Sequence, residues 1–111
     1  MNHQSTQKSL GLLLDIAPGC PQNCCTLSQM MVKKLQHRFG EHAVQDSCEG
    51  ERVEDGLVCG DLCRIKLDHT DDGHTQVIDT IVHLTQSIQQ QFQLQEQQFR
   101  VRLAGQAAPI A

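Results

Sequence analysis

Aromatic side chains are scarce in this chain of 111 residues, which has three phenylalanines and neither tryptophan nor tyrosine. Hydrophobic residues make up 39% of the chain, enough for a modest aliphatic core and so for one small folded domain. No apolar run approaches the roughly 20 residues that a membrane-spanning helix needs. We therefore predict a small single domain without a membrane span.

Motifs of catalysis are also missing. The sequence has no glycine-rich phosphate loop, no nucleophile elbow and no His-Glu-x-x-His pair. Only Cys59 with Asp61 suggests an enzyme, and no neighbouring base can be assigned to activate that thiol. These absences predict a protein that is not an enzyme.

Charge is distributed unevenly along the chain, whose net charge is −4. Between Glu41 and Asp79 there are eleven acidic residues and three basic ones. A phosphate backbone requires a basic patch, so this acidic middle argues against nucleic-acid binding. One basic cluster precedes it, and we interpret it as a set of cations at the negative end of a helix dipole: Lys33, Lys34, His37 and Arg38.

The N-terminal region contains a short apolar run, Leu10–Leu14, behind Lys8. A secretory signal needs about 7–15 uninterrupted apolar residues, and here Asp15 and Pro18 follow at once. We therefore expect a cytoplasmic protein, whose cysteines are thiols or metal ligands rather than disulfides.

The strongest helix signal covers residues Leu27–Phe39. Apolar side chains recur there every four residues, Thr26 and Gln29 have the spacing of a capping box, and Gly40 is placed to end the helix. Ahead of it, residues 1–9 are expected to be flexible. The apolar residues 10–16 are compatible with a short helix or with a buried extended segment.

The middle of the chain favours extended structure. Residues 40–56 are acidic and polar and predict a loop. Leu57–Asp68 alternates apolar and charged residues as a half-buried strand does, and Asp71-Asp72-Gly73 predicts a turn. Thr75–Leu84 is ambiguous: its β-branched residues favour the second strand of a hairpin, whereas its apolar spacing favours a helix.

Eight of the thirteen residues in Gln86–Gln98 are glutamine. Glutamine is a fair helix former and a poor turn residue, so we favour a C-terminal amphipathic helix over two short strands around Leu94 and Val101. Residues 105–111 are expected to form a flexible tail. The predicted fold class is α+β, one domain over residues 10–104 with a helix in the N-terminal half, a short hairpin or extended segment, and this glutamine-rich helix.

Four of the six cysteines form two pairs, each with three intervening residues, namely Cys20 with Cys24 and Cys59 with Cys63. Structural zinc takes four tetrahedral ligands, commonly as two such pairs. A zinc site at these four thiols is therefore one interpretation. Buried thiols that pack like small hydrophobic residues are a second, and disulfides, which would require export of the protein, are a third.

The segment Val58-Cys59-Gly60-Asp61, which runs into a predicted strand, resembles the first cysteine motif of iron–sulfur cluster assembly scaffolds. The resemblance implies a cluster site at Cys59 and Asp61. No cysteine follows Cys63, so the later ligands of that family have no counterpart here.

The function that we predict first is protein interaction, as an adaptor, chaperone-like or regulatory subunit that associates with a partner or with itself. A one-sided apolar helix near the end of a chain with a small core would gain by packing on another protein. The predicted binding face consists of Ile81, Leu84, Ile88, Phe92 and Phe99. The alternative is a metal-binding protein that uses the four cysteines.

Overall fold

The computed structural model describes residues 7–20, 24–54, 57–70, 73–106 and 108–110. Along the chain they form β1 (Gln7–Ile16), α1 (Cys24–Phe39), a 3₁₀ turn (Glu41–Ala43), β2 (Val44–Glu54), β3 (Leu57–Thr70), α2 (His74–Phe92) and β4 (Phe99–Leu103). The four strands form one antiparallel sheet in the order β2-β3-β1-β4. This succession and strand order are those of a split β-α-β fold.

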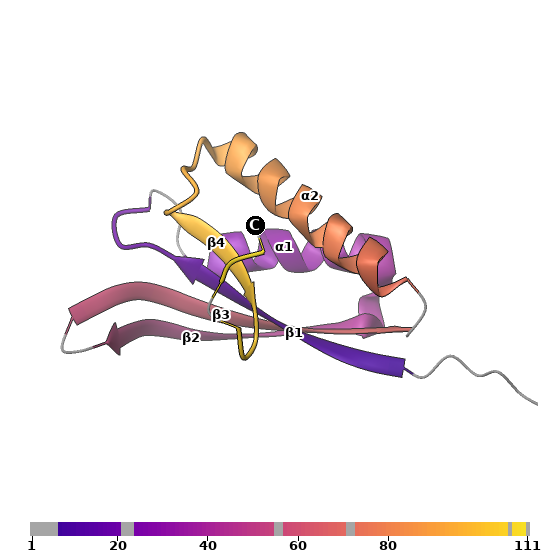
Figure 1. Cartoon of the computed structure of the whole chain (residues 1–111). Helices are drawn as coiled ribbons and strands as arrows, with labels where there is room; N and C mark the ends of the chain where they lie inside the picture. Colours follow the sequence, from indigo (N-terminus) through magenta and orange to yellow (C-terminus); the bar gives the residue numbers. More distant parts are fainter. Residues whose placement is uncertain (1–6, 21–23, 55–56, 71–72, 107, 111) are drawn as a thin grey trace, which may run out of the picture.

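Both helices lie on the same side of the sheet, and its other face carries no helix (Figure 1). Each crossover through a helix skips one strand position: β3 lies between β1 and β2, and β1 lies between β3 and β4. As a result β1 and β3 occupy the centre of the sheet, whereas β2 and β4 lie on its two sides.

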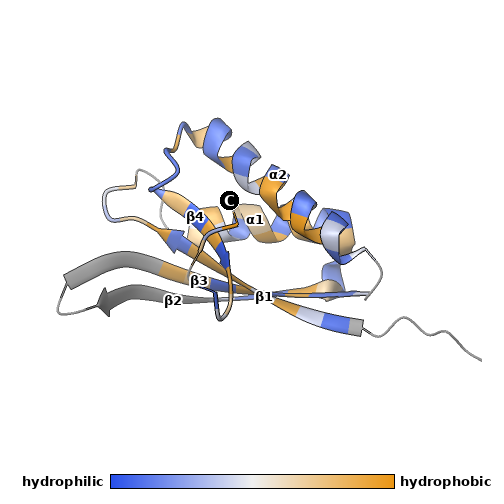
Figure 2. Cartoon of the chain, viewed as in Figure 1, coloured by the Kyte–Doolittle hydropathy of each residue, from blue (hydrophilic) through white to orange (hydrophobic). Residues whose placement is uncertain are grey.

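The core lies between the helices and the sheet, and the apolar pattern of the sequence explains it (Figure 2). Alternate residues of the two central strands point to this layer and are buried, such as Leu12 and Leu14 in β1 and Ile65 and Leu67 in β3. The helices contribute residues spaced by three or four, the fully buried Leu27, Met31, Leu35, Ile81 and Ile88.

The structure confirms the α+β class and several predicted elements. The predicted helix 27–39 lies within α1, which begins at Cys24. The predicted strand at Leu57–Asp68 is β3, which continues to Thr70. The apolar segment at 10–16 is extended, as part of β1. Of the two alternatives for Thr75–Leu84, the helix is correct.

Two predictions about the sheet were wrong. Residues 40–56 are not a loop, because Val44–Glu54 form β2. β2 is an edge strand that pairs only with β3 within the sheet, and an edge strand tolerates a polar sequence. The glutamine-rich helix stops at Phe92, where Gln93 adopts a left-handed conformation with φ 55°, and Phe99–Leu103 form β4.

The segment 105–111, which was predicted to be a flexible tail, contacts β4 where the structure describes it. Arg102 and Pro109 form an isolated antiparallel bridge, and the Ile110 amide donates a hydrogen bond of 2.9 Å to the Val101 carbonyl. Ile110 also packs against the core. The described part of the segment 105–111 therefore returns along β4.

One buried ion pair joins the two ends of the fold. Asp15 of β1 is buried, and both of its oxygens accept hydrogen bonds from Arg102 of β4, at 2.6 Å from Nε and 3.2 Å from Nη2. The contact joins residues 87 positions apart in the sequence.

Neither described helix is long and apolar enough to cross a membrane.

Candidate functional site

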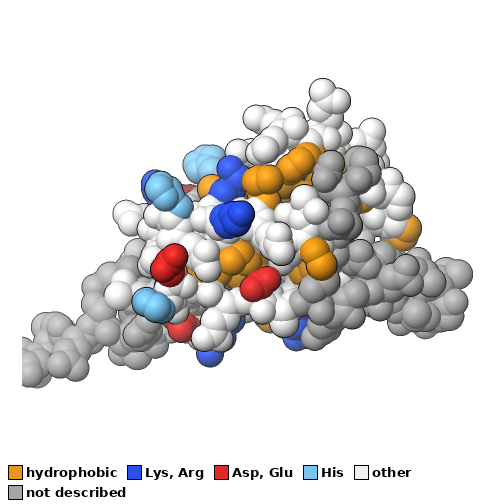
Figure 3. Space-filling model, turned by 180° about the vertical axis from the view of Figure 1, so that it is seen from behind, with side chains coloured by type: hydrophobic (Ala, Val, Ile, Leu, Met, Phe, Trp, Pro, Cys, Tyr) orange, Lys and Arg blue, Asp and Glu red, His pale blue; other side chains and the backbone are white. Residues whose placement is uncertain are grey.

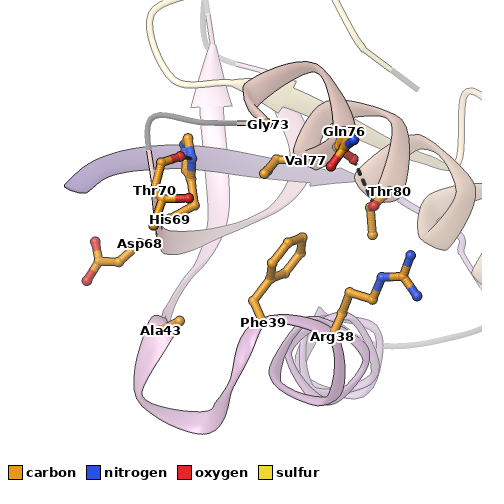
Figure 4. A pocket seen from close by; sticks show the side chains of 10 residues that line it. All are labelled: Arg38, Phe39, Ala43, Asp68, His69, Thr70, Gly73, Gln76, Val77 and Thr80. Carbon is orange, nitrogen blue, oxygen red and sulfur yellow. Dashed lines mark hydrogen bonds between the residues drawn. The ribbon is translucent and has the colours of Figure 1, made fainter. Parts of the chain in front are cut away.

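A polar cavity of about 470 Å³ lies where the end of α1, the 3₁₀ turn, the end of β3 and the start of α2 meet (Figure 4). Its volume is in the range of sites for small ligands. Phe39, Ala43 and Val77 supply its apolar wall. The other lining residues are polar or glycine, namely Arg38, Asp68, His69, Thr70, Gly73, Gln76 and Thr80.

The start of α2 forms one side of this cavity. Gly73 is the N-cap residue with φ 86°, a left-handed conformation that favours glycine, and no side chain caps the helix there. The Val77 amide bonds to the Gly73 carbonyl at 3.0 Å, and the Thr80 hydroxyl donates to the Gln76 carbonyl at 2.8 Å. Gly73, Gln76, Val77 and Thr80 of this part of the helix all line the cavity.

His69 is the one buried histidine among the described residues, with 7% of its surface exposed. It follows Ile65 and Leu67 in the alternation of β3, so it faces the helices. Its Nδ1 lies 2.6 Å from the Thr70 carbonyl oxygen, whereas its Nε2 is buried without a hydrogen-bond partner. A buried polar atom without a partner costs about 1–3 kcal/mol, so this atom needs an explanation.

A second histidine lies beside it. His74, the first residue of α2, is exposed, and its ring centroid is 5.4 Å from that of His69 with the ring planes 39° apart. Asp68 lines the same cavity and accepts a 2.6 Å hydrogen bond from the Ser9 hydroxyl. Sequence reasoning missed this pair, although the alternation through Leu67 would have placed His69 on the buried face.

The basic cluster of the sequence forms a continuous strip on α1. A groove of about 360 Å³ between the helices is lined by Lys33, Lys34, His37, Arg38 and Leu84. Arg38 also lines the polar cavity, so the strip leads into it. On the face that carries α1, Lys and Arg side chains lie next to apolar ones (Figure 3). We name these four basic residues the α1 basic strip.

The helix face predicted to bind a partner belongs largely to the core of the chain itself. Ile81, Ile88 and Phe99 are fully buried there, with 0% of their surface exposed. Leu84 and Phe92 are partly buried and pack against the same core. The prediction therefore needs correction, because Ile81, Ile88 and Phe99 have no exposed surface that a partner could contact.

The four cysteines predicted to bind zinc are described only in part. Cys20 is a half-buried free thiol. Cys63 is buried and disulfide-bonded, so the expectation that the cysteines are thiols or metal ligands rather than disulfides is wrong for Cys63. The side chains of Cys24 and Cys59, like that of Asp61 in the iron–sulfur-like motif, lie outside the described residues. A zinc site at the four cysteines would require Cys63 in its reduced form, and zinc content of the reduced protein tests that prediction.

Within the described side chains, no group of three or more His, Cys, Asp or Glu residues is placed to hold a metal ion. Comparison of the chain with family models, with curated proteins and with solved structures finds no match. A split β-α-β fold serves many unrelated functions, so the fold alone assigns none to this chain.

Proposed function

We propose that this protein is a non-catalytic interaction module that binds an acidic segment of a partner protein along the α1 basic strip. The observation that carries the proposal is the strip itself, an unneutralised basic surface on a protein of net charge −4. Within the described residues, none of its four side chains forms an ion pair. Glu41, near His37, is a carboxylate at its margin.

The helix dipole does not account for the whole strip. A dipole favours cations in the last turn of a helix, and in α1 that turn contains His37 and Arg38. Lys33 and Lys34 lie more than one turn before the end of the helix at Phe39. Their position is better explained by a function of the surface than by helix stability.

The geometry of the strip suits a peptide. Residues four apart on a helix are neighbours, so Lys33 with His37 and Lys34 with Arg38 form two adjacent rows. Leu84 of α2 provides an apolar patch beside them. An acidic segment with an apolar residue would place its carboxylates on the two rows and its apolar side chain against Leu84.

A protein partner fits this surface better than a nucleic acid. Single strands are usually held by exposed aromatic rings, whereas Phe99 is buried here and Phe39 and Phe92 pack against the core. The strip also contains only three permanently charged residues. A second copy of the chain is a poorer occupant. If the acidic region between Glu41 and Asp79 of one copy bound the strip of another, the contact would be heterologous and would add further copies without forming a closed oligomer.

The test is binding of a fluorescent Glu- and Leu-containing peptide, measured by anisotropy at two salt concentrations. The double variant Lys33→Glu/Lys34→Glu is expected to weaken binding about tenfold or more, because two attractions become repulsions. Binding to the parent protein is expected to weaken with salt. Lys33 is exposed and Lys34 is only partly buried, so the variant should keep its fold.

The matched control is Arg64→Glu/Lys66→Glu, which makes the same change of charge on the helix-free face of the sheet, where both residues are exposed. It should bind the peptide within about twofold of the parent, since long-range effects of net charge are screened by salt. Equal losses in both double variants would show that net charge alone governs binding, and the proposal would fail. Sedimentation at low salt adds a check, because salt-sensitive self-association through the strip would identify another copy as the partner instead.

A further inference from the structure

We propose that His69 and His74 form a binding site for a divalent transition-metal ion such as Zn²⁺, at the entrance to α2. The site uses two imidazole ligands, and water would complete the coordination. Its two ligands belong neither to the α1 basic strip nor to the four cysteines considered above, although Arg38 of the strip lines the same cavity.

The hydrogen bond at Nδ1 prepares His69 for this role. A carbonyl oxygen can only accept, so the 2.6 Å contact with Thr70 requires that Nδ1 of His69 carries the hydrogen. In the neutral ring Nε2 then has a lone pair, and that atom is the one without a partner. Histidines that bind metals typically donate the other ring N–H to a carboxylate or a backbone carbonyl, as His69 does here.

The position of His74 fits a shared ion. With Zn–N bonds of about 2.0–2.1 Å, two imidazoles on one tetrahedral ion have ring centroids about 5 Å apart. The observed separation between His69 and His74 is 5.4 Å. His74 is exposed and starts α2, so its side chain can turn toward the ion without disturbing the core.

The surroundings contain charges of both signs. The first turn of α2 is the positive end of its dipole and disfavours a cation. Asp68 also lines the cavity, but its carboxylate points away from His69 and accepts the hydrogen bond from Ser9, and Arg38 lies on the α1 side of the cavity (Figure 4). An anion would meet the lone pair of Nε2 in the neutral ring, so a cation is the better ligand for that atom.

Imidazole ligands select the kind of ion. They suit zinc, copper and nickel, whereas calcium and magnesium prefer oxygen ligands. With two protein ligands the affinity should be modest, and Mg²⁺ should not compete. The site would then respond to transition metals only.

The test is a titration of the disulfide-intact chain with Zn²⁺, followed by the imidazole nitrogen signals in NMR and by a chromophoric chelator that competes for the ion. Zn²⁺ is expected to shift the Nε2 signal of His69 together with a ring nitrogen signal of His74. His74→Ala should weaken Zn²⁺ binding at least tenfold. His83→Ala, which removes another exposed histidine of α2, should change it less than twofold.

The contrary results are equally specific. Zn²⁺ binding that is unchanged in His74→Ala, with the His69 signal unmoved, would place the ion elsewhere on the chain and overturn the proposal. A parallel titration with inorganic phosphate separates the other possibility: shifts of both histidines with phosphate but not with Zn²⁺ would make the cavity an anion site. His69→Gln gives a second check, because it should also weaken Zn²⁺ binding, and far-UV circular dichroism shows whether it remains folded.

Discussion

Replacing Ile88 by Asp is expected to unfold this protein. Ile88 has no exposed surface and lies in the core between α2 and the sheet. The substitution removes the apolar side chain and places a carboxylate where no water can solvate it. The combined cost of several kcal/mol is a large part of the 5–15 kcal/mol by which small domains are stable. Thermal and urea unfolding followed by circular dichroism would measure it.

Two control variants separate burial from a general effect of charge. Ile88→Val keeps an apolar residue and should cost about 0.5–1.5 kcal/mol. Ser87→Asp puts the same carboxylate on the adjacent exposed position and should change stability by less than about 0.5 kcal/mol. A folded Ile88→Asp monomer obtained from an oligomeric parent would instead support the partner-binding helix face that the sequence suggested.

Arg102→Met is expected to destabilise the fold by about 3 kcal/mol, because it leaves the buried Asp15 carboxylate without its bidentate partner. Asp15 takes part in at least one further interaction, which places the expected cost toward the lower end of the range for broken buried pairs. Arg102→Lys should recover only part of the loss, since an ammonium group does not reproduce the fork of a guanidinium. Urea unfolding provides the free energies.

The double variant Asp15→Asn/Arg102→Met tests whether the two residues act as a pair. It should be more stable than Arg102→Met alone, because the buried site then no longer holds a carboxylate that has lost its guanidinium partner. Arg100→Met, an exposed arginine on the same strand, should cost less than about 0.5 kcal/mol. If Arg100→Met and Arg102→Met were equally costly, the ion pair would have no special role in joining β1 to β4.

The sequence predicted the elements whose side chains repeat with a clear period. α1 was found because apolar residues recur every four positions, and β3 because Cys63, Ile65 and Leu67 alternate with charged residues. β2 was missed because only Val44 among its described side chains is buried, so its local sequence resembles a loop. Its strand structure comes from hydrogen bonds to β3, which local sequence does not encode.

The end of α2 and the candidate site depend on contacts that one segment of sequence cannot show. Phe99 has the spacing to continue the apolar side of the helix, yet it pairs with Ile16 of β1. The α1 basic strip was visible as a cluster of charges, but the groove beside Leu84 required both helices. His69 and His74 belong to a strand and a helix, and only the tertiary fold brings their rings together.

The central place of β1 has a consequence for how the chain acquires its structure. β1 is bordered by β3 and by β4, and its contact with β4 closes a loop of most of the chain. Closing this long loop costs chain entropy before the contacts of β4 with β1 can form and offset the cost. Folding should therefore be slow for a domain of this size. During synthesis β4 is made after the other three strands, and until it docks one edge of β1 is open to pairing with other nascent chains. Aggregation during expression should therefore depend more on how quickly β4 docks than on the stability of the finished fold.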